Sequence, residues 1–214
     1  MGSVSPNNTY GFEPNFSFSY SVILDVPVAD VFSIIGTSVG HERVTRLSGI
    51  CFAFVLLKAD AVTVPSSVSL ADTHVRLASS SEGPPPNASV RHLPRQFFAL
   101  TETATVLFGL IKTSVHLAGT LTWDEEAKLA LYETETTSGI SINVWKLRRF
   151  EQVEGNRTRV SETIQGRCPF WLKKTVQEQG SSQHMYVFKG FLCSITQLTT
   201  FYSAHMESYH TLFE

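Results

Sequence analysis

Residues 129–171 read LALYETETTSGISINVWKLRRFEQVEGNRTRVSETIQGRCPFW, and this stretch is the most informative about the fold. Its β-branched and aromatic residues are typical of strands. The pattern breaks at Ser138-Gly139 and at Glu154-Gly155-Asn156, where glycine and asparagine accept the positive φ of a tight turn. It ends at Cys168-Pro169, because proline lacks the N–H that a sheet requires and suits the first turn of a helix. The stretch predicts three antiparallel strands that lead directly into a helix.

The residues near the N-terminus predict one strand followed by two helices. Residues 16–26 alternate aromatic or aliphatic side chains with serine, which is the period of two of a half-buried strand. Pro27 ends this strand and begins a helix over 28–35, where an acidic first turn and apolar side chains at helical spacing favour helix. Residues 41–47 are expected to form a second, shorter helix.

The middle of the chain is less regular. Two apolar segments, 50–57 and 68–78, are separated by Pro65-Ser66-Ser67. We predict a strand for the second segment, whereas the first is compatible with strand or helix because periodicity alone does not decide a short apolar run. Residues 79–94 contain three consecutive prolines and predict a long loop. Two further strands are expected at 96–108 and 113–123.

Composition indicates one soluble domain. The 214 residues show no change of composition that would divide them, so we expect a polar arm over 1–14 and a single domain over 15–214. A net charge of −2, with basic and acidic residues interspersed, argues against a nucleic-acid partner. Neither a run of 18 apolar residues nor an apolar N-terminal segment occurs. We therefore expect a cytoplasmic protein without stable membrane insertion.

Cysteine and histidine spacing argues against metal binding. Cys51, Cys168 and Cys193 are odd in number and widely spaced, which favours neither a disulfide framework nor a zinc site. The spacings typical of zinc or phosphate-binding loops are absent as well. We expect no metal and no cofactor.

Residues 23–32 form a strand that runs into V-P-x-x-x-V-F, and residues 147–151 are followed by the pattern Gly155-x-x-Thr158-x-Val160-x-Glu162. With these motifs, the order strand, helix pair, antiparallel strands and last helix resembles the helix-grip fold of the START-like (SRPBCC) superfamily, which includes polyketide cyclases and lipid-transfer domains. The resemblance implies an α+β fold, with a curved antiparallel sheet gripping a long C-terminal helix. It also implies an apolar cavity that binds a hydrophobic small molecule.

The C-terminal region departs from the family pattern. A helical pattern begins at Phe170, but Gly180-Ser181-Ser182 interrupts it, and glycine within a helix costs about 1 kcal/mol relative to alanine. The stretch 193–203 is rich in threonine, serine and phenylalanine and is a poor helix former. We interpret residues 181–203 as an insertion in the gripping helix.

Two carboxylates are predicted to point toward the apolar side of the sheet. Glu102 lies on the apolar face of its strand, and Glu162 lies between Val160 and Ile164. A carboxylate in apolar surroundings must find a partner or raise its pKa, and a raised pKa suits a general acid or base. The alternative is that each is paired with a basic neighbour such as Arg148, or that a bulge changes the face.

Aromatic and basic residues complete the candidate site. Tyr132 falls on the inward face of its strand, and its ring and hydroxyl suit a flat ligand. His116 falls on the polar face of its own strand and is expected to point outward. The candidate catalytic residues are Glu102, Glu162, Tyr132 and Arg148. The candidate ligand-binding residues are Phe98, Leu117, Leu121, Trp123, Trp145, Val160 and Ile164.

Two main classes of function stay open. One is a cofactor-independent cyclase, dehydratase or isomerase of polyketide- or terpenoid-like metabolites in secondary metabolism. The other is a lipid or metabolite carrier, and a third, less favoured class is a co-chaperone-like protein that binds through the convex face of the sheet. A carrier favours an apolar lining with one polar anchor, because each unpaired buried polar group costs about 1–3 kcal/mol. Four inward polar residues therefore favour the enzyme. The oligomeric state is not predicted.

Overall fold

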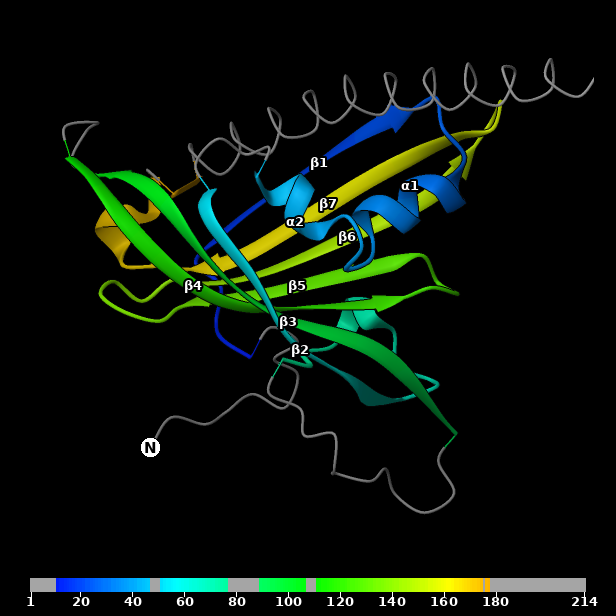
Figure 1. Ribbon diagram of the computed structural model, residues 1–214, viewed down its shortest axis with the longest axis horizontal. Coiled ribbons are helices and arrows are strands. Elements are labelled where there is room, and N and C mark those ends of the chain that lie inside the picture. The colour runs from blue at the N-terminus through cyan, green and yellow to red at the C-terminus, as the bar shows by residue number, and fades with distance from the viewer. Residues whose placement is uncertain (1–10, 47–50, 77–88, 107–110, 175, 178–214) are drawn as a thin grey trace, which may run out of the picture.

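A curved antiparallel sheet forms the body of the protein in this computed structural model (Figure 1). The structure describes residues 11–46, 51–76, 89–106, 111–174 and 176–177. Within these residues, seven strands lie in the order β1-β7-β6-β5-β4-β3-β2, and every neighbouring pair is antiparallel. The strands are β1 Phe16–Leu24, β2 Cys51–Pro65, β3 Val90–Val106, β4 Ile111–Asp124, β5 Leu129–Thr136, β6 Asn143–Val153 and β7 Arg157–Arg167. The predicted α+β class and curved antiparallel sheet are confirmed.

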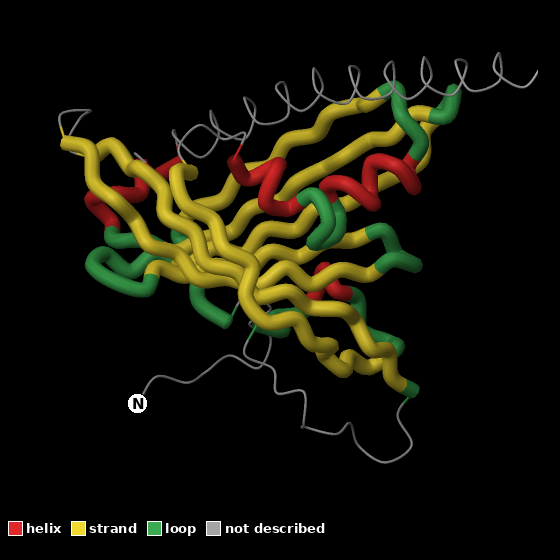
Figure 2. The backbone as a smooth tube through the Cα atoms, viewed as in Figure 1, coloured by secondary structure: helices red, strands yellow, loops and turns green. Residues whose placement is uncertain are grey.

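Two helices connect β1 to β2 and lie against one face of the curved sheet, as Figure 2 shows. Helix α1 spans Val28–Ile35 and packs against β6 and β7, whereas α2 spans His41–Arg46 and packs against β2. The side chains of Val31, Phe32 and Ile35 are buried beneath α1, as an amphipathic helix requires. We call the covered side of the sheet the inner face and the opposite side the outer face.

The turns of the β5–β7 meander follow the local chemistry of the sequence. Gly139 has a φ of 76°, and Gly155 and Asn156 have φ values of 71° and 58°. Positive φ is accessible to glycine and tolerated by asparagine, so both turns form where the sequence predicts them. Once the turns are fixed, the register places Arg148 opposite Glu162 and Tyr132 opposite Lys146.

The inner face carries the main hydrophobic core. Phe32 of α1 meets Phe150 of β6 edge to face, with ring centroids 5.1 Å apart. Such aromatic pairs stabilise a core beyond the area that they bury. Other fully buried members of this core come from β1, β3, β4 and β7, namely Leu24, Phe98, Leu121 and Val160.

A second core lies on the outer face, and it corrects one sequence prediction. Residues 68–76 do not form the predicted strand, and residues 77–78 lie outside the described part of the chain. Instead, Ser69 accepts a hydrogen bond from the amide of Ala71 at the start of the short 3-10 helix η1, Leu70–Asp72. Leu70 and Val75 are buried against the outer face of the sheet. The residues of this segment are therefore apolar because they pack against the outer face of the sheet, and not because they form one of its strands.

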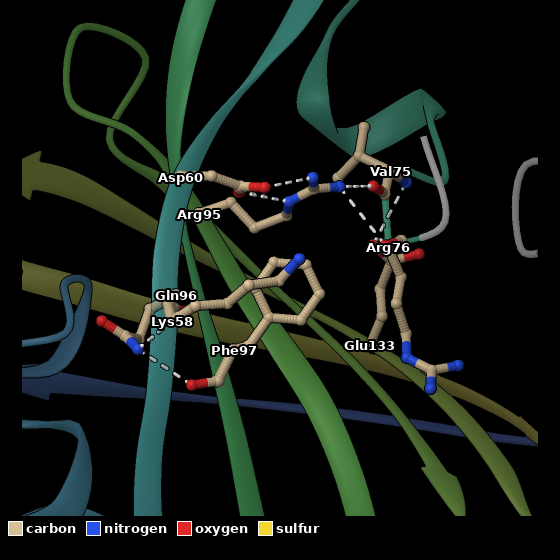
Figure 3. A network of polar contacts seen from close by, with 8 residues as sticks. All are labelled: Lys58, Asp60, Val75, Arg76, Arg95, Gln96, Phe97 and Glu133. Atoms are coloured by element: carbon tan, nitrogen blue, oxygen red, sulfur yellow. Dashed lines mark hydrogen bonds and ion pairs between the residues drawn. The ribbon is translucent and has the colours of Figure 1, made fainter. Parts of the chain in front are cut away.

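A buried arginine anchors this outer segment to the sheet (Figure 3). Arg95 donates to both carboxylate oxygens of Asp60, over 2.8 and 2.9 Å, and to the carbonyl oxygen of Val75 over 2.5 Å. Glu133 accepts from the amide of Val75 over 3.1 Å and also contacts His74. The planar fork of arginine is suited to satisfy a carboxylate and a carbonyl together. The network holds residues 73–76 across the outer face.

Strands β2 and β3 are longer than the sequence predicts. β2 forms the edge of the sheet and continues to Pro65, with a register shift between Leu56 and Ala59. The side-chain amide of Gln96 donates to the carbonyl oxygens of Leu57 and Lys58 at that shift. Residues 90–94 belong to β3 rather than to the predicted loop, and residues 79–88 lie outside the described residues.

Pro94 lies within β3 despite having no N–H. It is paired with Ala61 of β2, whereas pairing between β3 and β4 begins only at Arg95. Proline is tolerated at such a position because β4 requires no donor from it. Pro94 favoured a loop in the sequence, but it fits in β3 because the pairing of β3 with β4 does not extend to this residue.

After β7 the chain turns at Pro169 into the short 3-10 helix η2, Phe170–Leu172, and residues 173–174 and 176–177 are helical. The predicted gripping helix beyond this point and the predicted insertion over 181–203 lie outside the described residues, as do residues 1–10 of the predicted arm. In the ranges that the structure describes, no helix is long and apolar enough to span a membrane.

Candidate functional site

A buried ion pair lies in the middle of the inner face. Arg148 on β6 and Glu162 on β7 are directly opposite in the ladder, and their exposed fractions are 3% and 0%. Arg148 Nε donates to Glu162 Oε1 over 2.5 Å, and its Nη2 pairs with the same oxygen. Tyr20, which is opposite Glu162 on β1, donates its hydroxyl to Glu162 Oε2. The alternating period of three adjacent strands brings these side chains into one row.

The same arginine ties the sheet to the end of α1. Arg148 Nη1 and the hydroxyl of Tyr132 both donate to the carbonyl oxygen of Ile35, over 2.5 and 3.0 Å. The last carbonyls of a helix have no partner within it, and a cation is favourable there. We call Tyr20, Tyr132, Arg148 and Glu162 the buried cluster. The buried cluster supplies hydrogen-bond donors both to the last carbonyl oxygen of α1 and to the carboxylate of Glu162.

Electrostatics keep the buried cluster in one protonation state. Burial opposes a charge on Arg148, but Glu162, Tyr132 and Tyr20 together outweigh it and raise the pKa of Arg148 above its ordinary value. Burial raises the pKa of both Tyr20 and Tyr132, and Glu162 adds to each. Arginine stays charged and both tyrosines stay neutral near neutral pH. Three of the four predicted catalytic residues thus converge, but Glu162 is paired with Arg148, as the alternative interpretation held.

Glu102 lies apart from the buried cluster, toward one end of the inner face. It is half-buried on β3, where it is paired with Val115 of β4 and Cys51 of β2. Burial raises the pKa of Glu102, and the nearby charge of Lys146 partly opposes that rise. Glu102 is therefore protonated at higher pH than an ordinary glutamate, which is the condition for a proton donor near neutrality.

Lys146 is a site residue that was not predicted from the sequence. It is half-buried on β6, between Tyr132 of β5 and Ile164 of β7 in the ladder. Its Nζ lies 4.2 Å from the centroid of the Tyr132 ring. Burial lowers the pKa of Lys146, and Arg148 adds to this effect while Glu162 opposes it. The available signal was its spacing: Lys146 and Arg148 are two residues apart, so both point to the same face of a strand.

His41 is a second unpredicted site residue, and it is 4% exposed at the start of α2. Its ring meets Phe98, Phe54 and Tyr132 edge to face, with centroid distances of 4.5, 5.0 and 5.3 Å. Burial lowers the pKa of His41 to about 3, and the positive charges of Lys146 and Arg148 act in the same direction. The imidazole is therefore neutral. Within the described part of the chain, its Nδ1 has no hydrogen-bond partner.

A glycine on β4 makes room for this arrangement. Gly119 is directly opposite Phe98, and a Cβ at Gly119 would lie 2.7 Å from the Phe98 ring. Without that space Phe98 could not occupy its position, in which it stacks on Phe54 at an interplanar angle of 17°. The wall that surrounds His41 depends on this small residue.

The structure places six of the seven predicted ligand-binding residues on the inner face. Phe98, Leu121 and Val160 belong to the main core, Leu117 and Trp123 pack at its border, and Ile164 lies in an adjacent cluster with Phe16. His116 is exposed and hydrogen-bonds to Thr101 on the outer face, as predicted. Across the described ranges, no group of three or more His, Cys, Asp or Glu side chains is placed to hold a metal ion.

The prediction that Trp145 lines the same site is wrong. Trp145 points to the outer face, where it is buried in the second core with Leu131 and Leu147. Its Nε1 donates to the carbonyl oxygen of Thr73 over 3.1 Å. Because neighbours in a strand point to opposite faces, the inward position at this point of β6 belongs to Lys146.

Comparisons with solved structures agree with this architecture. No model of a protein family matches the sequence, and no curated protein matches it. TTHA0849 from Thermus thermophilus superposes with a TM-score of 0.55 at 14% identity, over 86% of this chain and 99% of that one. The Zhui aromatase/cyclase from Streptomyces sp. R1128 superposes with a TM-score of 0.51 at 10% identity, over 82% of this chain and 92% of that one. Ara h 8.0201 superposes with a TM-score of 0.47 at 12% identity, over 84% of this chain and 98% of that one. The chain therefore has the same α+β, helix-grip fold as TTHA0849 and the Zhui aromatase/cyclase.

Proposed function

We propose that the inner face binds a hydrophobic small molecule that carries a polar group. The observation that carries this proposal is His41, a buried neutral imidazole whose Nδ1 has no partner among the described residues. A buried polar atom without a hydrogen bond costs about 1–3 kcal/mol. A hydroxyl or carbonyl group of a ligand at Nδ1 would recover that cost.

The walls around His41 favour a flat, apolar ligand. Phe54 and Phe98 stack on each other, and these two rings and that of Tyr132 each meet the imidazole edge to face. Aromatic walls with a few polar groups are typical of sites for small apolar molecules. The printed name of one structural neighbour, an aromatase/cyclase, supports a polyketide-like ligand by analogy of fold, which is weaker support than the site itself.

A second candidate function is catalysis without a cofactor, by a cyclase, dehydratase or isomerase. Lys146 and Glu102 favour it, because burial lowers the pKa of the amine and raises the pKa of the carboxyl group. Two such shifts bring a base and an acid toward neutral pH on one face of the sheet. In this proposal Lys146 and Glu102 transfer protons, while Glu162, Arg148 and Tyr132 hold the site in shape. A carrier would bind the same ligand and release it unchanged.

A cytoplasmic role in secondary metabolism, without a nucleic-acid partner, completes the proposal. The net charge of −2 argues against a nucleic-acid partner, and the absence of a long apolar run in the sequence supports the cytoplasmic placement. The metabolic role rests on the analogy with the aromatase/cyclase.

A dye titration tests the binding proposal. Prodan is a neutral naphthyl ketone whose fluorescence rises and shifts to the blue in apolar surroundings. Leu117→Trp fills the border of the inner core, and we expect it to weaken Prodan binding at least about tenfold, or about 1.4 kcal/mol. His116→Trp changes the adjacent residue on the exposed face and should leave the affinity unaltered. Equal effects of the two substitutions, or no binding to the unmodified protein, would overturn the proposal.

A further inference from the structure

We propose that Lys146 captures an aldehyde or ketone on the inner face as a covalent imine, so that the ligands of this site are hydrophobic carbonyl compounds. This inference rests on the proposed function, because the carbonyl compound must first bind on the inner face. It adds the chemical class of the ligand and the atom that bonds to it.

The position of Lys146 suits a nucleophile. Its neighbours in the ladder are Tyr132 and Ile164, and its Nζ lies over the Tyr132 ring rather than in bulk solvent. It is nevertheless only half-buried, so the amine is not sealed in the core as Arg148 is. The Tyr132 ring also contacts His41, so Lys146 and the imidazole with the unpartnered Nδ1 lie against the same tyrosine.

The amine of Lys146 is not neutralised by a close carboxylate. Among the described residues, no Asp or Glu oxygen lies within 4.0 Å of its Nζ. Glu162 is engaged by Arg148 and Tyr20, and Glu102 acts on Lys146 only through its charge. A lysine without an ion pair, beside a fixed arginine in apolar surroundings, is in the setting that activates lysine toward carbonyl groups.

The chemistry balances without an added reagent. Burial and the charge of Arg148 lower the pKa of Lys146, which increases its neutral fraction. The lone pair of Nζ attacks the carbonyl carbon, a C–N bond forms, and the oxygen takes a proton from the nitrogen to give a carbinolamine. Glu102, whose pKa burial raises, donates a proton to the departing hydroxyl group. Water leaves and a C=N bond forms to give an iminium ion, whose N–H proton returns to the carboxylate of Glu102, so that amine and carbonyl give imine and water.

Reductive trapping tests the inference. The full chain is incubated with naphthaldehyde and sodium cyanoborohydride, which reduces an iminium ion to a stable amine, and the labelled lysine is found by peptide mapping. We expect Lys146 to be labelled at least about tenfold faster than Lys58. Lys58 is the matched lysine, because its Nζ also lies over an aromatic ring, 4.6 Å from the centroid of Phe97, but its side chain is exposed. Equal labelling of both lysines would overturn the inference.

Two variants and one competition complete the test. Lys146→Arg keeps the positive charge but cannot form an imine, so the fast labelling should disappear, whereas Lys58→Met should retain it. The unmodified protein supplies the site-specific rate without any substitution, so misfolding of a variant does not decide the result. An excess of Prodan should slow the labelling of Lys146. If Prodan binds but Lys146 is not labelled preferentially, the imine is contradicted and the binding proposal stands; if Prodan does not bind, the binding proposal fails too.

Discussion

Arg148 and Glu162 face each other directly across β6 and β7, and the guanidinium that pairs with the carboxylate also donates to the last carbonyl of α1. One side chain therefore joins the sheet to the helix that covers it. A consequence is that three of the four residues predicted as catalytic, Glu162, Arg148 and Tyr132, hold the fold together. Lys146, which forms no ion pair among the described residues, and His41, whose Nδ1 has no hydrogen-bond partner there, lie beside them.

Glu162→Gln should destabilise the protein strongly. The substitution leaves the charge of Arg148 buried without its partner, and breaking a buried pair in this way costs about 3–5 kcal/mol. Urea denaturation followed by circular dichroism measures the loss. Glu151→Gln is the control, because Glu151 pairs with Arg159 over 3.7 Å on the surface, where an ion pair contributes about 0–1 kcal/mol. Comparable losses for the two variants would contradict the role of the buried cluster.

Acid should destabilise the protein through His41. Its pKa is about 3 in the folded protein and about 6.5 in the unfolded chain, so below pH 6.5 the unfolded state binds a proton that the folded state refuses. Stability therefore falls as pH falls, and the loss between pH 7 and pH 5 is about 2 kcal/mol from this group. His41→Phe should lose that part of the pH dependence.

The matched control for this measurement is His116→Phe, because His116 is exposed. It should keep the pH dependence of the unmodified protein between pH 7 and pH 5. Urea unfolding at several pH values gives both curves. If His41→Phe follows the unmodified curve, the imidazole is not held neutral by burial.

The local parts of the fold were predictable, because short-range chemistry determines them. Gly139, Gly155 and Asn156 fix the turns of the meander, and the turns fix the register. The segment 68–76 was not predictable in the same way, because an apolar run reads alike whether it pairs within a sheet or crosses its face. Only the tertiary contact with the outer face distinguishes the two.

Strand alternation predicts which site residues on the strands point to the inner face, but it says nothing of site residues outside the strands. Alternation placed Glu162 and Tyr132 on the inner face, and applied consistently along β6 it also places Lys146 inward and Trp145 outward. His41 carried no sequence signal, because it belongs to no motif and its burial depends on Phe54 and Phe98 from distant strands.

Trp145→Phe should separate stability from binding. The phenyl ring cannot donate to Thr73, and the loss of one buried hydrogen bond costs about 1 kcal/mol of unfolding free energy. The affinity for Prodan should be unchanged, because Trp145 lies on the outer face. Trp123→Phe, at the border of the inner core, is the comparison and should alter the affinity. A change of Prodan affinity in Trp145→Phe would place the site on the wrong side of the sheet.

Arg95→Met should loosen the outer segment. The substitution leaves Asp60 and the carbonyl oxygen of Val75 without their donor, which costs about 3 kcal/mol for a buried, charge-assisted network. Hydrogen exchange should accelerate at the amide of Val75, which donates to Glu133 in the same network. Arg159→Met removes an exposed arginine and should change neither quantity beyond about 0.5 kcal/mol. Unaltered exchange at Val75 in Arg95→Met would show that the segment is held by its apolar contacts alone.

The ¹⁵N NMR signals of the histidine ring nitrogens during a Prodan titration show whether the ligand reaches His41. We expect the His41 Nδ1 signal to shift in step with the dye fluorescence, because Nδ1 donates a hydrogen bond to the carbonyl oxygen of Prodan, whereas the signals of exposed His116 should not move. If Prodan saturates the protein and the His41 signal stays where it was, the ligand does not bind at the inner face as proposed.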